Sequence, residues 1–175
     1  MLYELDGVRP EIAGDAWVAP DAVVIGDVVL GSRATIWFGC LVRGDTNRIR
    51  IGARTNIQDL TVLHVNPGEG WDCIIGEDVT VGHSAIVHAC RLHDGAFVGM
   101  GATVLDGAVI ESGGMLAAGG LLAPGKRIPA GELWAGAPAR KMRDIGAEER
   151  ARLDGIAVHY AGMGGRYRAG LKVVG

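Results

Sequence analysis

The sequence predicts an all-β solenoid, a parallel β-helix of short repeated coils, followed by one C-terminal α-helix. Aliphatic residues recur at intervals of six from residue 12 to residue 134, and glycine accounts for 29 of the 175 residues. An interval of six matches neither the period of a helix nor that of a single strand. It fits one short strand plus one tight turn, so three hexads complete a triangular coil with one aliphatic side chain pointing inward from each face. Stacked coils would pair their backbones about 4.8 Å apart and bury a continuous aliphatic column.

The hexads form four runs along the chain. A three-residue insertion precedes Ile51, the segment VNPGEGWDC precedes Ile75, and a one-residue shift precedes Leu92. The inward positions are Ile12, Val18, Val24, Leu30, Ile36, Val42, Ile51, Ile57, Leu63, Ile75, Val81, Val87, Leu92, Val98, Val104, Ile110, Leu116, Leu122, Ile128 and Trp134. No segment between residues 10 and 135 has helical spacing, which argues against a parallel α/β domain.

After Pro138 the apolar spacing changes to alternating threes and fours, which predicts an amphipathic helix over residues 147–168. Its apolar stripe comprises Leu153, Ile156, Tyr160, Met163 and Tyr167. Glycines at positions 155, 162, 164 and 165 each weaken a helix by up to about 1 kcal/mol relative to alanine. We therefore expect the helix to need support from the β-helix or from a neighbouring subunit. The chain divides into a β-helix domain, residues 1–138, and a helical segment, residues 139–175, that packs on it.

Composition narrows the function classes and the compartment. A net charge of −3 argues against nucleic acid as the main partner. We interpret the basic residues near the C-terminus as a solvated helix face; they are Arg150, Arg152, Arg166, Arg168 and Lys172. No apolar run reaches the length of a membrane span, and charged residues interrupt the N-terminus where a signal peptide would be apolar. Cys40, Cys73 and Cys90 show no CxxC spacing, which favours reduced, buried thiols in a cytoplasmic protein.

The hexad register places three histidines, although two of them are only five residues apart in sequence. Arg43, His64 and His88 each follow an inward residue of the same face, so they form one column. His64 and His88 then lie about one strand spacing apart, close enough to bind one ion. His83 belongs to the preceding face, where it lies above Asp59 and beside Gln58.

Since His83 is around a corner from the other two, we expect it to reach the metal of a neighbouring subunit. A closed ring of triangular prisms would bring these faces together, which predicts a homotrimer with three interfacial sites. Three imidazoles with an open fourth position are typical of catalytic zinc, although Fe²⁺ or Co²⁺ would also accept three nitrogens. We interpret His93 and His159 as structural or surface residues.

With these residues placed, the chain resembles the γ-class carbonic anhydrase-like family of hexapeptide-repeat proteins. The matching motifs are VRGD, NIQD, VGHSAIVH, GMGATVLDGAVI and WAGAPAR, and the similarity covers nearly the whole chain. The resemblance implies a left-handed β-helix. It also implies reversible hydration of CO₂ to bicarbonate by a metal-bound hydroxide.

The resemblance assigns roles to individual residues. His64 and His88 of one subunit and His83 of the next would bind the metal. Gln58 would orient the bound water or substrate with support from Asn56. Arg43 and Asp59 would form an ion pair between subunits, and Asp45 would belong to the same polar cluster. Tyr160 would either overhang the pocket as a hydrogen-bond partner or simply pack on the apolar stripe.

The sequence departs from the family at its proton shuttle. The family's best catalysts carry glutamates on an acidic loop, whereas this chain has Thr46 after Asp45 and a short loop after His64. The acidic residues between His64 and His83 that could transfer protons are Glu69, Asp72 and Glu77. None of them matches the position of the family's shuttle glutamates. The sequence therefore predicts the metal ligands but not the route by which protons leave the site.

Two other functions compete with hydration of CO₂. Many hexapeptide β-helices are acyltransferases, so a transferase or thioesterase acting on a CoA-linked substrate is one alternative; fold alone does not decide. The other is a metal-bearing protein with little activity. The sequence contains no dinucleotide-binding loop, P-loop or nucleophile elbow.

Overall fold

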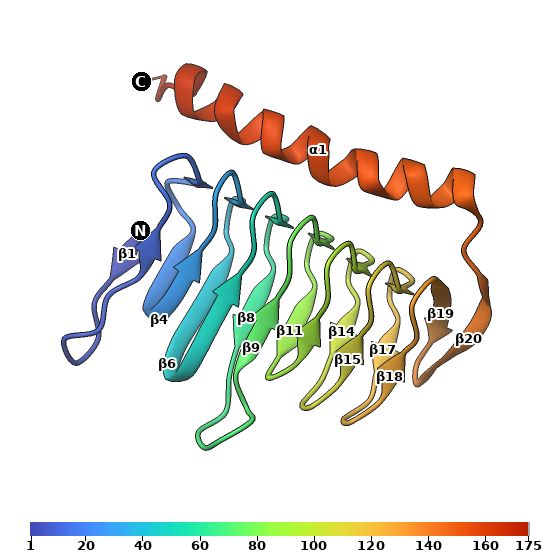
Figure 1. The fold of residues 1–175 in the computed structure, drawn as a ribbon. Coiled ribbons are helices and arrows are strands. Elements are labelled where there is room, and N and C mark those ends of the chain that lie inside the picture. The colour runs from blue at the N-terminus through green and yellow to red at the C-terminus, as the bar shows by residue number, and fades with distance from the viewer. Residues whose placement is uncertain (175) are drawn as a thin grey trace.

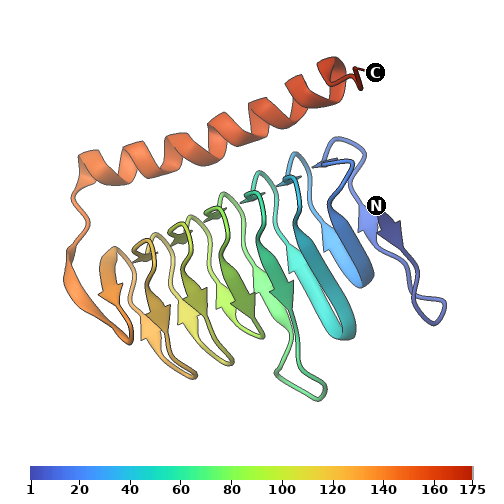
Figure 2. The same cartoon turned by 180° about the vertical axis from the view of Figure 1, so that it is seen from behind.

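The computed structural model describes residues 1–174 and shows a triangular solenoid with one long helix lying beside it (Figures 1 and 2). Gly175, the last residue of the predicted segment 139–175, lies outside the described residues. The strands form three faces, here called A, B and C, which the chain visits in that order in every coil.

Each face is a ladder of parallel strands. Face A contains β1 (Leu2–Tyr3), the first parts of β4 (Val23–Leu30) and β6 (Leu41–Ile51), β8 (Val62–His64), β11 (Ile86–His88), β14 (Thr103–Val104) and β17 (Leu121–Leu122). Face B contains β2 (Glu11–Ile12), the second parts of β4 and β6, β9 (Cys73–Ile75), β12 (Arg91–Leu92), β15 (Val109–Ile110) and β18 (Arg127–Ile128). Face C contains β3 (Trp17–Val18), β5 (Thr35–Ile36), β7 (Asn56–Ile57), β10 (Thr80–Val81), β13 (Phe97–Val98), β16 (Met115–Leu116) and β19 (Glu132–Gly136).

The hexad register predicted from the sequence is confirmed by the burial of the inward residues. Ile36, Ile57 and Val81 on face C are fully buried, as are Val42 and Leu63 on face A. Their neighbours one coil away are their hydrogen-bonded partners, so equivalent hexads stack directly on one another. The core is therefore a column of aliphatic side chains along the axis of the solenoid.

All three departures from the six-residue interval fall at one corner, between faces A and B. β6 runs through this corner as a single long strand, which accounts for the insertion before Ile51. Residues 65–72 form the loop between β8 and β9 at the same corner, and they project on the side away from the helix (Figure 1). The one-residue shift follows β11, where Ala89 adopts a left-handed backbone conformation at φ 41°.

Beyond β19 the chain reverses and then becomes helical. β20 (Ala139–Asp144), which the sequence did not predict, pairs antiparallel with β19. The helix α1 (Ala147–Gly170) begins where the sequence predicts and ends two residues later than residue 168. It runs back along the solenoid over face C (Figures 1 and 2).

The predicted apolar stripe of α1 is only half buried, because smaller residues form the centre of the contact. Ala157, Ala161 and Gly164 are the buried residues of the helix. Tyr160 and Tyr167 pack beside them against aromatic side chains of β3 and of the residues after β5. The helix thus approaches face C through small side chains, with larger ones on either side.

The basic residues of α1 are not uniformly solvated, which corrects the sequence interpretation. The guanidinium of Arg150 donates from Nη1 to the carbonyl oxygens of Gly95 and Gly113, at 3.0 and 3.1 Å. Arg168 donates to the carbonyl oxygen of Ala16. These two arginines attach the helix to coil backbones, because turn carbonyls that lack a ladder partner accept charged donors well.

The three cysteines are free thiols buried in the core. Burial raises the pKa of Cys40 to about 12, so this thiol is inert at neutral pH. Across residues 1–174, no helix has the length and hydrophobicity required to cross a membrane.

Candidate metal centre

His64 and His88 are the end residues of two adjacent strands on face A, β8 and β11. Their backbones are paired in register, and the inward Leu63 and Val87 before them turn both imidazoles to the outer surface. The ring centroids are 5.0 Å apart, and Nδ1 of His64 lies 3.0 Å from Nε2 of His88. Two nitrogens bound to one tetrahedral zinc ion lie about 3.3 Å apart, so only a small opening of the pair would admit the ion.

A carboxylate holds the far side of His64. Nε2 of His64 lies 3.0 Å from Oδ1 of Asp45, and Asp45 also forms an ion pair with Arg43. Burial acts to raise the pKa of Asp45, but the hydrogen bonds from His64 and Arg43 outweigh it and hold the pKa below its ordinary value. Asp45 is therefore an ionised acceptor at neutral pH, and Nε2 is the protonated nitrogen of His64.

A second carboxylate holds His88 in the same way. Nδ1 of His88 lies 2.5 Å from Oδ1 of Asp106, which comes from the corner after β14 in the next coil. Asp106 is not among the candidate site residues predicted from the sequence. The hexad register could have found it, because Asp106 lies two positions after the inward Val104 and so reaches the same corner as His88.

His83 follows β10 and lies at the corner between faces C and A. Its Nδ1 is 2.8 Å from Oδ2 of Asp59, the residue at the equivalent position one coil below. Ser84 turns the chain here with φ 59°, which brings His83 to the exposed edge. Within residues 1–174, no three His, Cys, Asp or Glu side chains of the single chain converge on one metal position.

The three histidines share one arrangement: one ring nitrogen faces an aspartate, and the other remains available. An ionised carboxylate only accepts hydrogen bonds, so the facing nitrogen carries the proton and the other presents its lone pair. Histidine ligands of metals are typically held in this way. The donor set therefore fits a divalent metal that prefers imidazole.

Gln58 is buried beside His83 and is held by a chain of hydrogen bonds along face C. Its Nε2 donates to Oδ1 of Asn56 at 3.0 Å, and Nδ2 of Asn56 donates to Oγ1 of Thr80 at 2.9 Å. Because this chain fixes both amide orientations, the Oε1 oxygen of Gln58 remains as an acceptor for water or substrate.

A cavity of about 460 Å³ lies between face C and α1, next to these groups. Most of its wall is apolar, and its polar side chains are Gln58, His83, Arg152, His159 and Tyr160. The Tyr160 ring packs edge-on against Trp37, with centroids 5.2 Å apart. Burial, helped by the charge of Asp59, raises the pKa of Tyr160. Tyr160 therefore both packs on the core and presents a neutral hydroxyl near the site.

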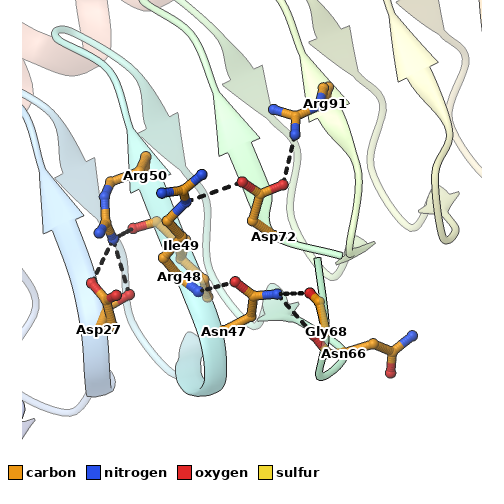
Figure 3. A network of polar contacts seen from close by, with 9 residues as sticks. All are labelled: Asp27, Asn47, Arg48, Ile49, Arg50, Asn66, Gly68, Asp72 and Arg91. Atoms are coloured by element: carbon orange, nitrogen blue, oxygen red, sulfur yellow. Dashed lines mark hydrogen bonds and ion pairs between the residues drawn. The ribbon is translucent and has the colours of Figure 1, made fainter. Parts of the chain in front are cut away.

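The acids that the sequence offers for proton transfer are mostly engaged elsewhere. Asp72 is buried and accepts from Arg48 at 3.1 Å and from Arg91 at 2.7 Å, as Figure 3 shows. Glu77 pairs with Arg54 at 2.7 Å. Glu69 lies at the exposed tip of the loop of residues 65–72.

His93 and His159 lie apart from the ligand pair. His93 is exposed on face B, with Nε2 3.7 Å from Oε2 of Glu111. His159 is exposed on α1 and borders the cavity, where its ring packs edge-on against Tyr160.

Several of the curated proteins similar to this chain carry carbonic anhydrase names, and others, such as "Protein YrdA" of Escherichia coli at 45% identity, do not. "Gamma carbonic anhydrase 2, mitochondrial" of Arabidopsis thaliana is 48% identical over 88% of the chain and 57% of its own length. "Probable carbonic anhydrase" of Methanocaldococcus jannaschii is 47% identical over 85% of the chain and 92% of its own length. "Carbonic anhydrase" of Geobacillus kaustophilus is 38% identical over 97% and 92%. The chain spans less than two thirds of the plant relatives it matches. No family model matches the chain.

Solved structures match the whole architecture. A hexapeptide transferase family protein from Anaplasma phagocytophilum has a TM-score of 0.91 and 47% identity, covering 95% of this chain and 97% of that one. A proposed acetyltransferase of Bacillus cereus has a TM-score of 0.93 and 38% identity, covering 96% of both chains. These matches establish a left-handed hexapeptide-repeat β-helix with one C-terminal helix.

Proposed function

The chain belongs to the γ-class carbonic anhydrase-like family of hexapeptide-repeat proteins, and from this premise we propose that it is a metal-dependent carbonic anhydrase. In this proposal it hydrates CO₂ reversibly to bicarbonate at the interfaces of a homotrimer. The metal is Zn²⁺, with Fe²⁺ or Co²⁺ as the alternatives.

The observation that carries the proposal is the pairing of each of three histidines with its own aspartate. His64 with Asp45 and His83 with Asp59 have nitrogen–oxygen distances of 3.0 and 2.8 Å, and the third pair, formed by His88, is shorter. In each pair the second ring nitrogen points away from the carboxylate, and those of His64 and His88 face each other at 3.0 Å. This pattern is what three metal ligands require.

The proposed trimer follows from the positions of these ligands on the solenoid. His64 and His88 lie on face A, whereas His83 lies at the corner where face C meets face A. One chain can supply two ligands to one site and one ligand to the next only if neighbouring chains meet at these surfaces. A closed ring satisfies every chain in the same way.

A bound metal would act as a Lewis acid and lower the pKa of the water that it binds to near neutral pH. The chain's own residues then bind and orient the reactants. The apolar wall of the cavity suits CO₂, which has no charge to solvate. The fixed Oε1 of Gln58 accepts a hydrogen bond from water or from the bicarbonate hydroxyl, and the neutral hydroxyl of Tyr160 can donate one to a carboxylate oxygen.

Protons must leave the site without a dedicated acidic loop. Asp72 and Glu77 are held in ion pairs with arginines, and Thr46 has no titratable group. We therefore expect buffer molecules to remove the protons, so that turnover rises with buffer concentration at constant pH.

The test combines metal analysis, a CO₂ hydration assay and subunit mixing. Protein purified without oxygen should contain one metal per chain and hydrate CO₂. His83→Ala and His88→Ala should each lose metal and activity. When the two variants are co-assembled at equal amounts, about a quarter of the sites should combine intact ligands from neighbouring subunits.

The mixing result separates shared sites from sites within one chain. If each site belonged to a single chain, the mixture would contain no intact site and would recover nothing. His93→Ala is the matched control, because it removes an exposed histidine from face B and should leave metal content and activity unchanged. A wild-type trimer without metal would contradict the proposal.

Two further outcomes correspond to the competing functions. Binding and turnover of acetyl-CoA in metal-free protein would favour acyl transfer, a reaction named for some relatives of this fold. A full complement of metal without hydration, in oxidised and in reduced protein, would indicate a metal-bearing protein with little activity.

A further inference from the structure

Asp106 lies within the motif GMGATVLDGAVI, but it is the one aspartate of the three that is not among the candidate site residues predicted from the sequence. Both of its carboxylate oxygens are engaged. Oδ1 accepts from Nδ1 of His88 at 2.5 Å, and Oδ2 accepts from Nδ2 of Asn66 at 2.8 Å. The amide of Asn66 therefore fixes which way the carboxylate turns toward the histidine.

Asn66 belongs to the loop of residues 65–72, and this loop is fastened at both ends. Near its start, Nδ2 of Asn47 donates to the carbonyl oxygens of Asn66 and Gly68 at 3.2 and 2.7 Å (Figure 3). At its end, two arginines from neighbouring coils of face B hold the buried Asp72. A loop held in this way keeps Asn66 in a fixed position relative to the coil above.

We propose that Asp106 is a positioning residue for the metal ligand His88, and that Asn66 directs Asp106. The loop of residues 65–72 thereby braces the metal site, although no side chain of the loop touches the metal. The proposal rests on the proposed function for the presence of a metal. Its physical content is that Asp106 keeps the proton on Nδ1 of His88 and leaves the lone pair on Nε2, the nitrogen that faces His64.

The substitution Asp106→Asn should reverse this arrangement. Nδ2 of Asn66 requires an acceptor, so the new amide would turn its oxygen toward Asn66 and its NH₂ group toward His88. His88 would then accept on Nδ1 and carry its proton on Nε2, where the metal should bind. The double variant Asn66→Asp with Asp106→Asn exchanges donor and acceptor between the two positions and should restore the original proton position.

Two measurements test the proposal. Nitrogen-15 NMR of histidine-labelled, metal-free trimer reports which ring nitrogen of His88 carries the proton. Wild type and the double variant should show Nδ1–H, and Asp106→Asn should show Nε2–H. Competition with a chelator should give a zinc affinity about 10–100-fold weaker for Asp106→Asn, with recovery in the double variant.

Asp78→Asn is the matched control, because it alters an aspartate paired with Arg54 at 2.7 Å at the corner between faces B and C, outside the three histidine–aspartate pairs. It should change neither readout. If Asp106→Asn fails to fold, Asp106→Ala provides the second variant, in which Nδ1 of His88 loses its acceptor and mixed proton positions on His88 are expected. An unchanged His88 tautomer in either variant, or no rescue in the double variant, would overturn the proposal.

Failure of the proposed function gives a different result. If the wild-type protein binds zinc but does not hydrate CO₂, the proposed enzyme activity is wrong and the positioning role of Asp106 still stands. If the wild-type protein binds no zinc, the proposed metal site is wrong. The tautomer of His88 in the metal-free protein then still tests whether Asp106 positions this histidine.

Discussion

At the scale of single residues, aspartates determine what the histidines can do. Asp45, Asp59 and Asp106 each face one ring nitrogen and leave the other available. An imidazole without such a partner can rotate and can carry its proton on either nitrogen. The carboxylates remove both freedoms before any ligand arrives, which lowers the cost of binding.

Asp45 should make the stability of the protein depend on pH in the acid range. Its pKa is lower in the folded chain than the value of about 3.9 expected in the unfolded chain. Its contribution to stability is therefore present above that unfolded value and is lost as the pH falls through the folded value. Urea unfolding of metal-free protein at fixed concentration should show wild type more stable than Asp45→Asn at pH 6, with the difference shrinking below about pH 4. A difference that stays constant down to pH 2 would contradict this.

The sequence was sufficient to predict the relative positions of the histidines. The hexad register separates His83 from His64 and His88, because His83 follows an inward residue of face C and the other two follow inward residues of face A. The same register did not single out Asp106, since an aspartate in a turn is usually a turn residue and nothing more. Its role depends on a hydrogen bond between coils, which spacing alone does not reveal.

At the scale of elements, α1 packs on face C through small residues that allow a close approach of the two backbones, and not through a broad apolar stripe. Gly164 packs against Thr35 and Trp17, where a Cβ atom would lie only 2.5 Å from Cγ2 of Thr35. The sequence predicted the helix because its large apolar residues follow helical spacing. It could not predict which side lies deepest, because the spacing of large residues does not show where small ones allow two backbones to approach.

Two glycines of α1 should therefore respond oppositely to the same substitution. Gly162 has open space around it, so Gly162→Ala should raise the free energy of unfolding by up to about 1 kcal/mol through helix propensity. Gly164→Ala should lower it by about 1–3 kcal/mol, because the new methyl group collides with face C. Urea unfolding of the two variants at equal protein concentration is the measurement. Equal effects of the two substitutions would mean that the helix does not dock through Gly164.

At the scale of the whole molecule, the covered and uncovered parts of the solenoid differ. The helix covers face C, whereas the corner leading to face A exposes Leu60 and Met100, 65% and 60% accessible respectively. Met100 occupies the position equivalent to His83 one coil above, and Leu60 follows Asp59, which occupies that position one coil below. The proposed subunit interface would bury these apolar side chains, because they lie beside His83, the ligand that each chain offers to its neighbour.

Leu60→Asp should weaken the trimer without straining the fold. Leu60 has φ 63°, a conformation that aspartate tolerates better than leucine does. Light scattering after gel filtration should show the mass of three 18.2 kDa chains for wild type and a shift toward one chain for the variant. Val158→Asp is the control, since Val158 is 63% exposed on α1 and should not affect assembly. Full trimer mass for Leu60→Asp would place the interface elsewhere.

The single corner that absorbs every irregularity of the repeat has a consequence for the history of this protein. At the other two corners the repeat keeps its six-residue interval. A change of length there would disturb either the contact with α1 or the proposed contact between subunits. Between faces A and B, the chain can lengthen or shorten beside the histidines while each aliphatic side chain keeps its level in the column. Relatives can therefore diverge in chemistry at this corner and still share one scaffold, and gaps in their alignment should collect there.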